Sequence, residues 1–242
     1  MNSKVEYVGK DLEAMDFAVN YHRWILETVK PYLGNHLVEV GAGTGAFSDL
    51  LLETEPETLS LIEPSAMVET LKTNLAAKDF STEIRIYPNI FAEVAERLQT
   101  EQSPDSVIYI NVLEHIEEDE AELKIVHQTL RETGRVFIFV PALPMLFSEF
   151  DKRIGHFRRY RKKEIIEKCA AAGFRILLAN YFDAAGILPW LMKYRLLKST
   201  TMESGAVRLY DKIVVPLAKP LENFITPPIG KNLLIVAEKI SS

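Results

Sequence analysis

Three glycines alternate with other residues directly after a short apolar run, His36–Val40. Gly41, Gly43 and Gly45 carry no Cβ, so a ligand can approach their backbone N–H groups closely. A strand that enters such a turn and leaves it as a helix predicts a cradle for a cofactor. The dinucleotide-binding pattern places its third glycine three residues after the second, so a pyrophosphate is not the best fit here. The alternative interpretation is a tight strand-to-helix turn with no ligand.

Polar side chains follow two later apolar runs as well. Glu63 comes directly after Thr58–Ile62, where its carboxylate can accept both hydroxyls of a ribose. A cap for the following helix is the alternative role. Ser106–Ile110 is followed by the polar segment Asn111–His115. Because parallel strands end at the same edge of a sheet, these segments are expected to meet at one site.

Five short β-branched or aliphatic runs recur at intervals that leave room for one helix between each pair. They are His36–Val40, Thr58–Ile62, Glu83–Tyr87, Ser106–Ile110 and Gly134–Val140. The helices expected between them cover Gly45–Glu53, Ser65–Asn74, Phe91–Leu98 and Asp119–Leu130. Beyond Val140 the pattern predicts a loop to Arg161, a helix near Lys163–Ala172, and strands near Phe174–Phe182 and at Asn232–Ala237. The predicted fold class is therefore α/β, a Rossmann-like, doubly wound, mostly parallel seven-stranded sheet with helices on both faces.

The 242 residues are interpreted as a single domain, residues 1–242. An amphipathic pattern over Asp11–Lys30 predicts a leading helix, and residues 1–34 are assigned to an N-terminal helical lid. Residues 35–140 form the expected cofactor-binding core. Residues 141–242 carry a substrate-side loop, a helical capping insertion at 184–230 and the terminal strand.

The net charge of −6 hides an asymmetry. Residues 1–150 hold 11 Lys and Arg against 26 Asp and Glu, whereas residues 151–242 hold 17 against 8. The acidic half argues against a nucleic-acid partner, which needs a broad cationic surface. Seven of the basic residues lie in residues 151–163, which form either a solvated loop or the anion-binding edge of a pocket.

The cysteine content and the amino terminus indicate the compartment. A single cysteine, Cys169, excludes an internal disulfide framework and any multi-thiolate metal site. The amino-terminal residues lack the apolar core of a secretory signal. We therefore expect a cytoplasmic protein.

Three segments, in order, carry a resemblance to a known family: VEVGAGTG at Val38–Gly45, LIEPS at Leu61–Ser65, and INVLEHIEED at Ile110–Asp119. The chain resembles the class I S-adenosylmethionine-dependent methyltransferases, and is similar to a bacterial methyltransferase-type-11/12-like subgroup. The resemblance implies that S-adenosylmethionine is the cofactor. It implies that the glycine turn lies against the methionine portion, that Glu39 reaches its ammonium, that Glu63 holds the ribose, and that Asn89 and Ile90 grip the adenine. The full implied set is Glu39, Gly41, Ala42, Gly43, Gly45, Glu63, Pro64, Asn89, Ile90, Asn111 and Val112.

The resemblance also bears on metal binding at Glu114 and His115. Metal-dependent members have Glu-x-x-Glu-His at this place, and here Asn111 replaces the first acid. Since Mg²⁺ prefers carboxylates and water, we expect no metal, and His115 to be a wall of the active site. A hydrogen bond from His115 to a backbone carbonyl is the alternative.

The basic loop supplies the other candidates for chemistry. It follows the fifth strand and is expected above the methyl donor, so His156 is a candidate base and Tyr160 can close the pocket. Arg158 and Arg159 are expected to pair a substrate carboxylate or phosphate. The alternative is a structural network of Asp151, His156 and an arginine that holds the loop.

Two apolar segments precede the final strand. Residues 184–197 are too short and too charged to span a bilayer, and a helix is expected over Val207–Asn223. The two segments form a lid over a bulky substrate, a patch for peripheral membrane contact, or a dimer contact or plain core. Trp190 and Tyr194 are candidate substrate-binding residues, and the oligomeric state stays open.

The activity predicted from these residues and the resemblance is methyl transfer to an oxygen, or less readily a nitrogen, of a small anionic or lipophilic acceptor. The transfer proceeds by in-line displacement, and the chain's main role is positioning. Two alternatives are a non-catalytic S-adenosylmethionine- or nucleoside-binding module and a dinucleotide-dependent oxidoreductase. The glycine spacing disfavours the second.

Overall fold

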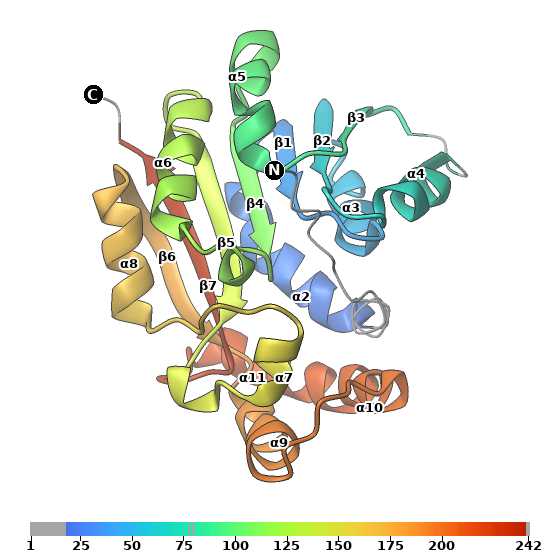
Figure 1. Ribbon diagram of the computed structural model, residues 1–242, viewed down its shortest axis with the longest axis vertical. Helices are drawn as coiled ribbons and strands as arrows, with labels where there is room; N and C mark the ends of the chain where they lie inside the picture. The colour runs from blue at the N-terminus through green and yellow to red at the C-terminus, as the bar shows by residue number, and fades with distance from the viewer. Residues whose placement is uncertain (1–17, 77, 79, 241–242) are drawn as a thin grey trace.

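A single seven-stranded sheet organises the molecule (Figure 1). The structure is a computed structural model that describes residues 18–76, 78 and 80–240. The strand order is β3-β2-β1-β4-β5-β7-β6, with β7 antiparallel to both of its neighbours and the other adjacent pairs parallel. The strands are β1 (His36–Val40), β2 (Thr58–Ile62), β3 (Glu83–Tyr87), β4 (Ser106–Ile110), β5 (Arg135–Pro141), β6 (Phe174–Phe182) and β7 (Asn232–Lys239). The predicted fold class is confirmed.

Alternate residues of the central strands enter separate cores on the two faces of the sheet. In β5, Val136, Ile138 and Val140 join one cluster, while Phe137 and Phe139 join the other. This alternation explains the unbroken apolar runs, because a parallel strand covered on both faces has no solvent side. One face packs against α5 (Phe91–Gln102), α6 (Asp119–Thr129) and α8 (Lys162–Ala171). The other packs against α2 (Val19–Val29), α3 (Ala46–Leu52), α4 (Val68–Ala76) and α11 (Val215–Phe224).

The leading helix is only partly described. Its predicted beginning at Asp11 lies outside the described residues, and α2 is followed by a 3-10 turn, η1 (Lys30–Tyr32). Trp24 and Ile25 are buried among the residues under the sheet. The described part of the predicted lid is therefore also a layer of the core.

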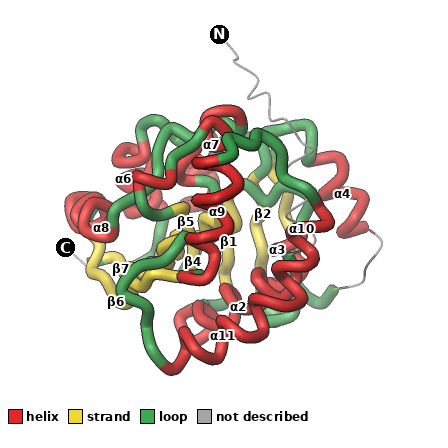
Figure 2. Tube along the Cα trace, turned by 90° about the horizontal axis from the view of Figure 1, so that it is seen from below, coloured by secondary structure: helices red, strands yellow, loops and turns green. Residues whose placement is uncertain are grey.

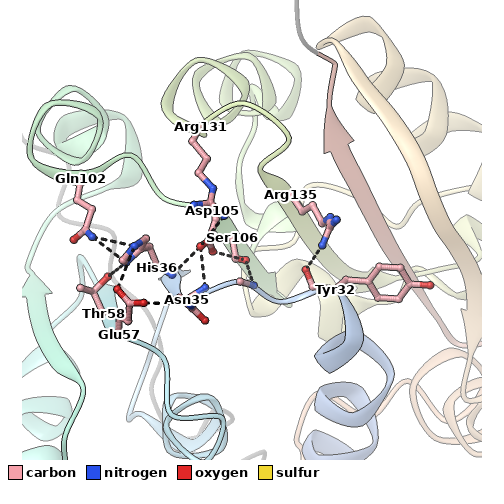
Figure 3. Close-up of polar contacts among 11 residues, drawn as sticks. Tyr32, Asn35, His36, Glu57, Thr58, Gln102, Asp105, Ser106, Arg131 and Arg135 are labelled. Carbon is pink, nitrogen blue, oxygen red and sulfur yellow. Dashed lines mark hydrogen bonds and ion pairs between the residues drawn. The ribbon is translucent and has the colours of Figure 1, made fainter.

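Asp105 connects three segments at the amino-terminal end of the sheet (Figure 3). Its Oδ2 accepts hydrogen bonds from the backbone N–H of Asn35 at 2.8 Å and of His36 at 3.0 Å, and lies 3.4 Å from Nη2 of Arg131. Oδ1 accepts from the Ser106 hydroxyl. These bonds fix the starts of β1 and β4 side by side.

The segment after β5 differs from the loop predicted to Arg161. It contains a 3-10 turn, η3 (Pro144–Leu146), and a short helix, α7 (Glu149–Arg153), which begins with a capping box between Ser148 and Asp151. A helix of five residues is too short for its periodicity to be detected in the sequence.

The insertion before β7 is helical, as predicted. It consists of η4 (Ala184–Gly186), α9 (Ile187–Trp190), the π-helical η5 (Leu191–Leu196), α10 (Ser204–Leu209), the π-helical η6 (Tyr210–Val214) and α11. The helix expected over Val207–Asn223 runs without a break from Ser204 to Phe224. Figure 1 shows α7, α9 and α10 below the carboxyl ends of the parallel strands. Within the described residues, we find no helix with the length and apolar character needed to cross a membrane.

Candidate active site

A cavity of about 460 Å³ lies at the carboxyl ends of β1, β2 and β4, on the side that faces the viewer in Figure 2. The glycine turn, the segments after β2 and β4, the loop after α7 and the start of the insertion all contribute to its wall. Of the predicted site residues, the following line it: Glu39, Gly41, Ala42, Gly43, Glu63, Pro64, Ile90, Asn111, Val112, His115, His156, Arg159 and Trp190.

The glycine turn brings backbone against the cavity. A Cβ on Gly41 would lie 2.5 Å from Cγ2 of Val112, so no side chain fits between these two segments. A Cβ on Gly43 would meet no protein atom within 4 Å, and its φ of +57° is one that residues with side chains rarely adopt. Gly43 thus leaves open space beside a bare backbone, as a cofactor cradle requires. Gly45 is not part of the wall and instead packs against Leu71 of α4.

Glu63 links the glycine turn to the segment after β2. Its Oε2 accepts a hydrogen bond from the Gly43 N–H at 2.7 Å, and its Oε1 accepts from the Ser65 N–H at 2.9 Å. The carboxylate is buried and lines the cavity. Each oxygen has a second lone pair, so Glu63 can hold a diol while it also bonds the backbone.

Glu39 lies at the carboxyl end of β1 and is buried beneath the glycine turn. Burial raises the pKa of its carboxyl to about 8, although the hydrogen bond from the Ser48 hydroxyl opposes the shift. A cationic group placed beside Glu39 would favour the ionised form. Its position suits the ammonium that the resemblance assigned to it.

Only one of the two residues predicted to hold the adenine lines the cavity. Ile90 lines the cavity and is 47% exposed. Asn89 is not part of the wall, and its amide donates to Oε2 of Glu93 at 3.1 Å. The structure therefore places Asn89 in the turn just before α5, outside the wall of the cavity.

His156 lies between two carboxyl groups. Its Nδ1 is 3.1 Å from Oδ1 of Asp151, and its Nε2 is 3.7 Å from Oε1 of Glu114. Asp151 also accepts from Nε of Arg159 at 2.8 Å and from the Ser148 hydroxyl at 2.6 Å. The network of Asp151, His156 and an arginine weighed from the sequence thus exists, and its His156 and Arg159 line the cavity.

Glu114 is the least satisfied polar group of this cluster. It is fully buried, and neither of its oxygens has a hydrogen-bond partner among the described residues. Burial raises the pKa of Glu114 to about 7, while His156 and Arg159 oppose the shift. The ring of His115 packs edge-on against that of His156, with centroids 4.5 Å apart. Burial and the neighbouring His156 lower the pKa of His115 to about 3, so the His115 ring is neutral near pH 7.

Glu114, His115 and His156 also have the composition of a metal site. One ligand atom from each lies within 4.8 Å of the others. The prediction of no metal rested on Asn111, and the tertiary structure adds His156 to the group. Arg159 acts on Glu114 as a fixed positive charge from the same wall, and that charge opposes a second cation.

Three predicted residues lie behind the wall and not in it. The Tyr160 hydroxyl is buried and donates to Oδ2 of Asp119 at 2.8 Å, and burial raises its pKa. Arg158 pairs with the same carboxylate at 2.9 Å, so it is Arg159 that lines the cavity. Tyr194 packs against Phe150 and Trp190 and does not contact the cavity. The structure thus does not bring these three residues into the wall of the cavity, and their catalytic and substrate-binding roles stay predictions.

Several lining residues were not predicted from the sequence. They are Tyr21 and His22 of α2, Phe150 of α7, Met202 of the insertion, and Lys231 and Asn232 before and in β7. They come from elements far apart in the chain, and no spacing connects them. A signal existed only for Asn232, since the start of an antiparallel strand lies beside the end of β5.

The comparison with known families agrees with this geometry. Residues 17–179 match the model of the methyltransferase domain family. The chain belongs to this family. The predicted resemblance, enzyme class and S-adenosylmethionine as methyl donor are thereby confirmed at the level of the family. In the comparison with curated proteins, no sequence matches this chain.

Solved structures show the same fold. A SAM dependent methyltransferase from Archaeoglobus fulgidus is 18% identical, and the match covers 94% of this chain and 98% of that chain with a TM-score of 0.63. The 1,6-didemethyltoxoflavin-N1-methyltransferase of Burkholderia thailandensis, solved with 1,6-didemethyltoxoflavin and S-adenosylhomocysteine, is 16% identical, with 96% and 83% covered and a TM-score of 0.59. The cyclopropane synthase MmaA2 from Mycobacterium tuberculosis is 13% identical, with 86% and 79% covered and a TM-score of 0.55. At these identities the likeness is one of fold.

Proposed function

We propose that this methyltransferase transfers a methyl group to an oxygen, or less readily a nitrogen, of a small lipophilic acceptor, with His156 as the proton acceptor. The observation that carries the proposal is that the glycine turn, Glu63 and His156 share one cavity, with Asp151 hydrogen-bonded to the His156 ring. Family membership supplies the reaction class. The proton acceptor and the acceptor class are the added elements.

The donor side is assigned to the glycine turn and the two acids beside it. S-adenosylmethionine supplies an electrophilic methyl group when bound. Glu39 would face its ammonium and Glu63 its ribose, while Ile90 and Val112 offer apolar contact to the base. Asn111 has a φ of +54° and its N–H donates to the carbonyl of Phe139, which fixes the segment after β4 at the cavity.

His156 has the arrangement of a general base. Asp151 at Nδ1 favours the tautomer in which Nδ1 carries the proton, so Nε2 presents its lone pair. In the proposed step the acceptor oxygen forms a bond to the methyl carbon as the sulfur–carbon bond breaks, and the hydroxyl proton goes to Nε2. Such proton transfer contributes roughly 10²–10⁴-fold to the rate.

The charges in the cavity favour a lipophilic acceptor over an anionic one. Arg159 and Lys231 are cations of the wall, and each is ion-paired at 2.8 Å with a buried carboxylate, Asp151 or Asp183. The Arg159 guanidinium also lies over the Trp190 ring, 4.4 Å from its centroid. A substrate carboxylate would have to compete with these partners, whereas an apolar acceptor finds Phe150 and Trp190 directly. The single cysteine, Cys169, is buried and free, which fits the proposed cytoplasmic location.

The test is a transfer assay with methyl-labelled S-adenosylmethionine against aqueous and lipid extracts, with mass identification of the labelled products. We expect label in an O-methylated product of the lipid fraction. Label confined to anionic water-soluble products would overturn the acceptor class. Donor binding with no transfer to either fraction would favour the nucleoside-binding module, and a thermal shift with NAD but not with S-adenosylmethionine would favour an oxidoreductase.

A further inference from the structure

Exposed apolar side chains are concentrated on the insertion. Sixteen large hydrophobic side chains are exposed in the part of the chain that the structure describes, and eleven of them lie between residues 188 and 229. A single exposed leucine is ordinary, but a set gathered on one segment marks an interaction surface. The eleven are Leu188, Met192, Leu196, Leu197, Leu209, Ile213, Leu217, Leu221, Phe224, Ile225 and Ile229.

The long helix from Ser204 to Phe224 carries much of this set on one side. Leu209, Ile213, Leu217 and Leu221 recur every four residues, which places them in a row along one face. The opposite face is buried through residues such as Val215 and Ala218, which belong to the core under the sheet. The helix is therefore apolar on both sides, and the residues that the structure describes cover only one of them.

The preceding helical segment repeats the arrangement. Leu188, Met192 and Leu196 have the same spacing of four residues, while Tyr194 of the same segment is buried. The two helical segments face each other across a second cavity of about 150 Å³, lined by residues of both. We call the eleven exposed residues on these two segments and the chain after them the insertion face.

Most of the exposed charges around the insertion face are positive, and the exposed acid of this segment is Glu203. Arg195, Lys198 and Lys212 are exposed beside the apolar rows. Residues 184–230 contain three acids, Glu203, Asp211 and Glu222. The carboxylates of Asp211 and Glu222 point into the protein. Asp211 accepts from the backbone N–H of Asn20 and Tyr21, and Glu222 accepts from those of Asp183 and Ala184. A protein of net charge −6 thus presents a mostly cationic rim around the segment that holds eleven of its sixteen described exposed apolar side chains.

We propose that the insertion face binds the surface of an anionic lipid bilayer. Helices that expose apolar rows flanked by Lys and Arg lie in the plane of the interface, where apolar burial and attraction to anionic headgroups add. The two helical segments that carry the insertion face also enclose the second cavity, and Trp190 and Met202 line both this cavity and the main one. Vesicle binding is independent of the proposed chemistry, whereas delivery of a lipid-borne acceptor rests on the proposed function.

The experiment is co-sedimentation of the full chain with vesicles of phosphatidylcholine alone and with vesicles that also contain phosphatidylglycerol. We expect the protein to partition onto the anionic vesicles and to be released from them by high salt. Leu217→Glu should lower this partition by roughly tenfold or more. The substitution removes an apolar contact between Leu217 and the lipid, and it adds a negative charge that the anionic headgroups repel. Ile240→Glu is the matched control, since Ile240 is equally apolar, 54% exposed and outside the insertion.

The electrostatic part is tested separately. Lys212→Glu should lower partition onto anionic vesicles by about fivefold or more and leave the weak binding to phosphatidylcholine unchanged. Thermal unfolding checks that the exposed substitutions keep the fold. The proposal is overturned if the wild-type chain does not partition onto anionic vesicles at physiological salt, or if Ile240→Glu lowers partition as much as Leu217→Glu. It is also overturned if light scattering shows a dimer that Leu217→Glu dissociates, because a second copy would then cover the face.

Discussion

Two buried carboxyl groups flank strand β4, Asp105 directly before it and Glu114 four residues after it. Asp105 accepts three hydrogen bonds, from the N–H groups of Asn35 and His36 and from the Ser106 hydroxyl, and pairs with Arg131. Glu114 is more deeply buried and has no hydrogen-bond partner among the described residues. The carboxylate before β4 therefore has its hydrogen bonds filled, whereas the carboxyl group after β4 has none.

The difference shows which end of the sheet is built for stability and which for chemistry. An unpaired buried polar group costs roughly 1–3 kcal/mol, and more when it is charged. The fold accepts this cost at the carboxyl edge, where ligands of open α/β sheets bind. At the amino edge, Figure 3 shows the carboxylates of Glu57 and Asp105 and the amides of Asn35 and Gln102 bonded to their neighbours.

The largest expected effect separates the two histidines of these ends. His156→Asn should lower turnover by roughly 10²–10⁴-fold, because it removes the proton acceptor, and should leave donor affinity unchanged. His36→Asn is the matched control, since His36 contacts Thr58 and Gln102 at the amino edge and should leave turnover unchanged. Single-turnover kinetics and calorimetry with S-adenosylmethionine measure both. Equal turnover in the two variants would show that the Asp151–His156 pair only braces the loop.

Removing an acid should weaken donor binding at the carboxyl end of β2 and leave it unchanged at the amino end. Glu63→Ala removes a charge-assisted contact worth roughly 1.5–3 kcal/mol and should weaken S-adenosylmethionine binding accordingly. Glu57→Ala changes the acid at the other end of β2, where Glu57 accepts from the Asn35 amide, and should leave affinity unaltered. Calorimetry on both folded variants decides the matter. An unchanged affinity in Glu63→Ala would remove the ribose assignment.

The free energy of unfolding should instead depend more on the carboxyl group at the amino end of β4 than on the one at its carboxyl end. Asp105→Asn should lower the free energy of unfolding by about 1–3 kcal/mol, because it weakens the bonds that join β1 to β4. Glu114→Gln should not lower it near neutral pH, since the neutral amide replaces a group whose ionised form burial disfavours. Urea unfolding of both variants tests the comparison, and a larger loss in Glu114→Gln would reverse it.

The pH dependence follows from the raised pKa of Glu114. The folded state holds its proton up to about pH 7, whereas an unfolded glutamate releases it near its ordinary pKa of about 4.5. Over that window the folded state binds more protons, so this group's contribution to stability falls as the pH rises. Glu39, with a pKa of about 8, contributes in the same direction up to a higher pH. Glu114→Gln should reduce the slope between about pH 4.5 and 7, and an unaltered slope would show that Glu114 is not buried as described.

The smallest expected effect is that of chelation. The cluster of Glu114, His115 and His156 supplies one carboxylate and two imidazoles, and Arg159 adds a positive charge to the same wall. Because Mg²⁺ prefers several oxygen ligands, turnover should stay unchanged after exhaustive chelation. Loss of activity that magnesium restores would show that these three residues form a metal site after all.

The fold could be predicted in detail because its signals are local. The runs at β1, β2, β3 and β4 were predicted with the bounds that the structure has, and β6 likewise. The inner strands β1, β2 and β4 are covered on both faces and are therefore mostly apolar, so their ends are clear in the sequence. The edge strand β3 instead alternates charged and apolar residues, which is also a strand pattern. The glycine turn and Glu63 were assigned correctly to one edge for a related reason, since both come directly after strands.

What lies next to the donor site could be predicted only in part. Arg158 and Arg159 are adjacent and identical in type, yet one pairs with Asp119 outside the cavity and the other lines it. Tyr160 has the character of a catalytic group, but its hydroxyl is bound to Asp119. In an extended segment successive side chains point in opposite directions, and no pattern of types shows which direction is inward.

The sequence by itself determined the strands and the order of the loops along the chain, because each depends on hydrophobic periodicity or on residues that are close together in the chain. The class of reaction followed from the resemblance of three short segments to a known family. Only the tertiary structure decided that β7 lies between β5 and β6, and that His156 lies between Asp151 and Glu114. The physical reason is that His156 and Glu114 are brought together by packing across the sheet edge, and such a contact between distant segments leaves no periodic trace in the sequence.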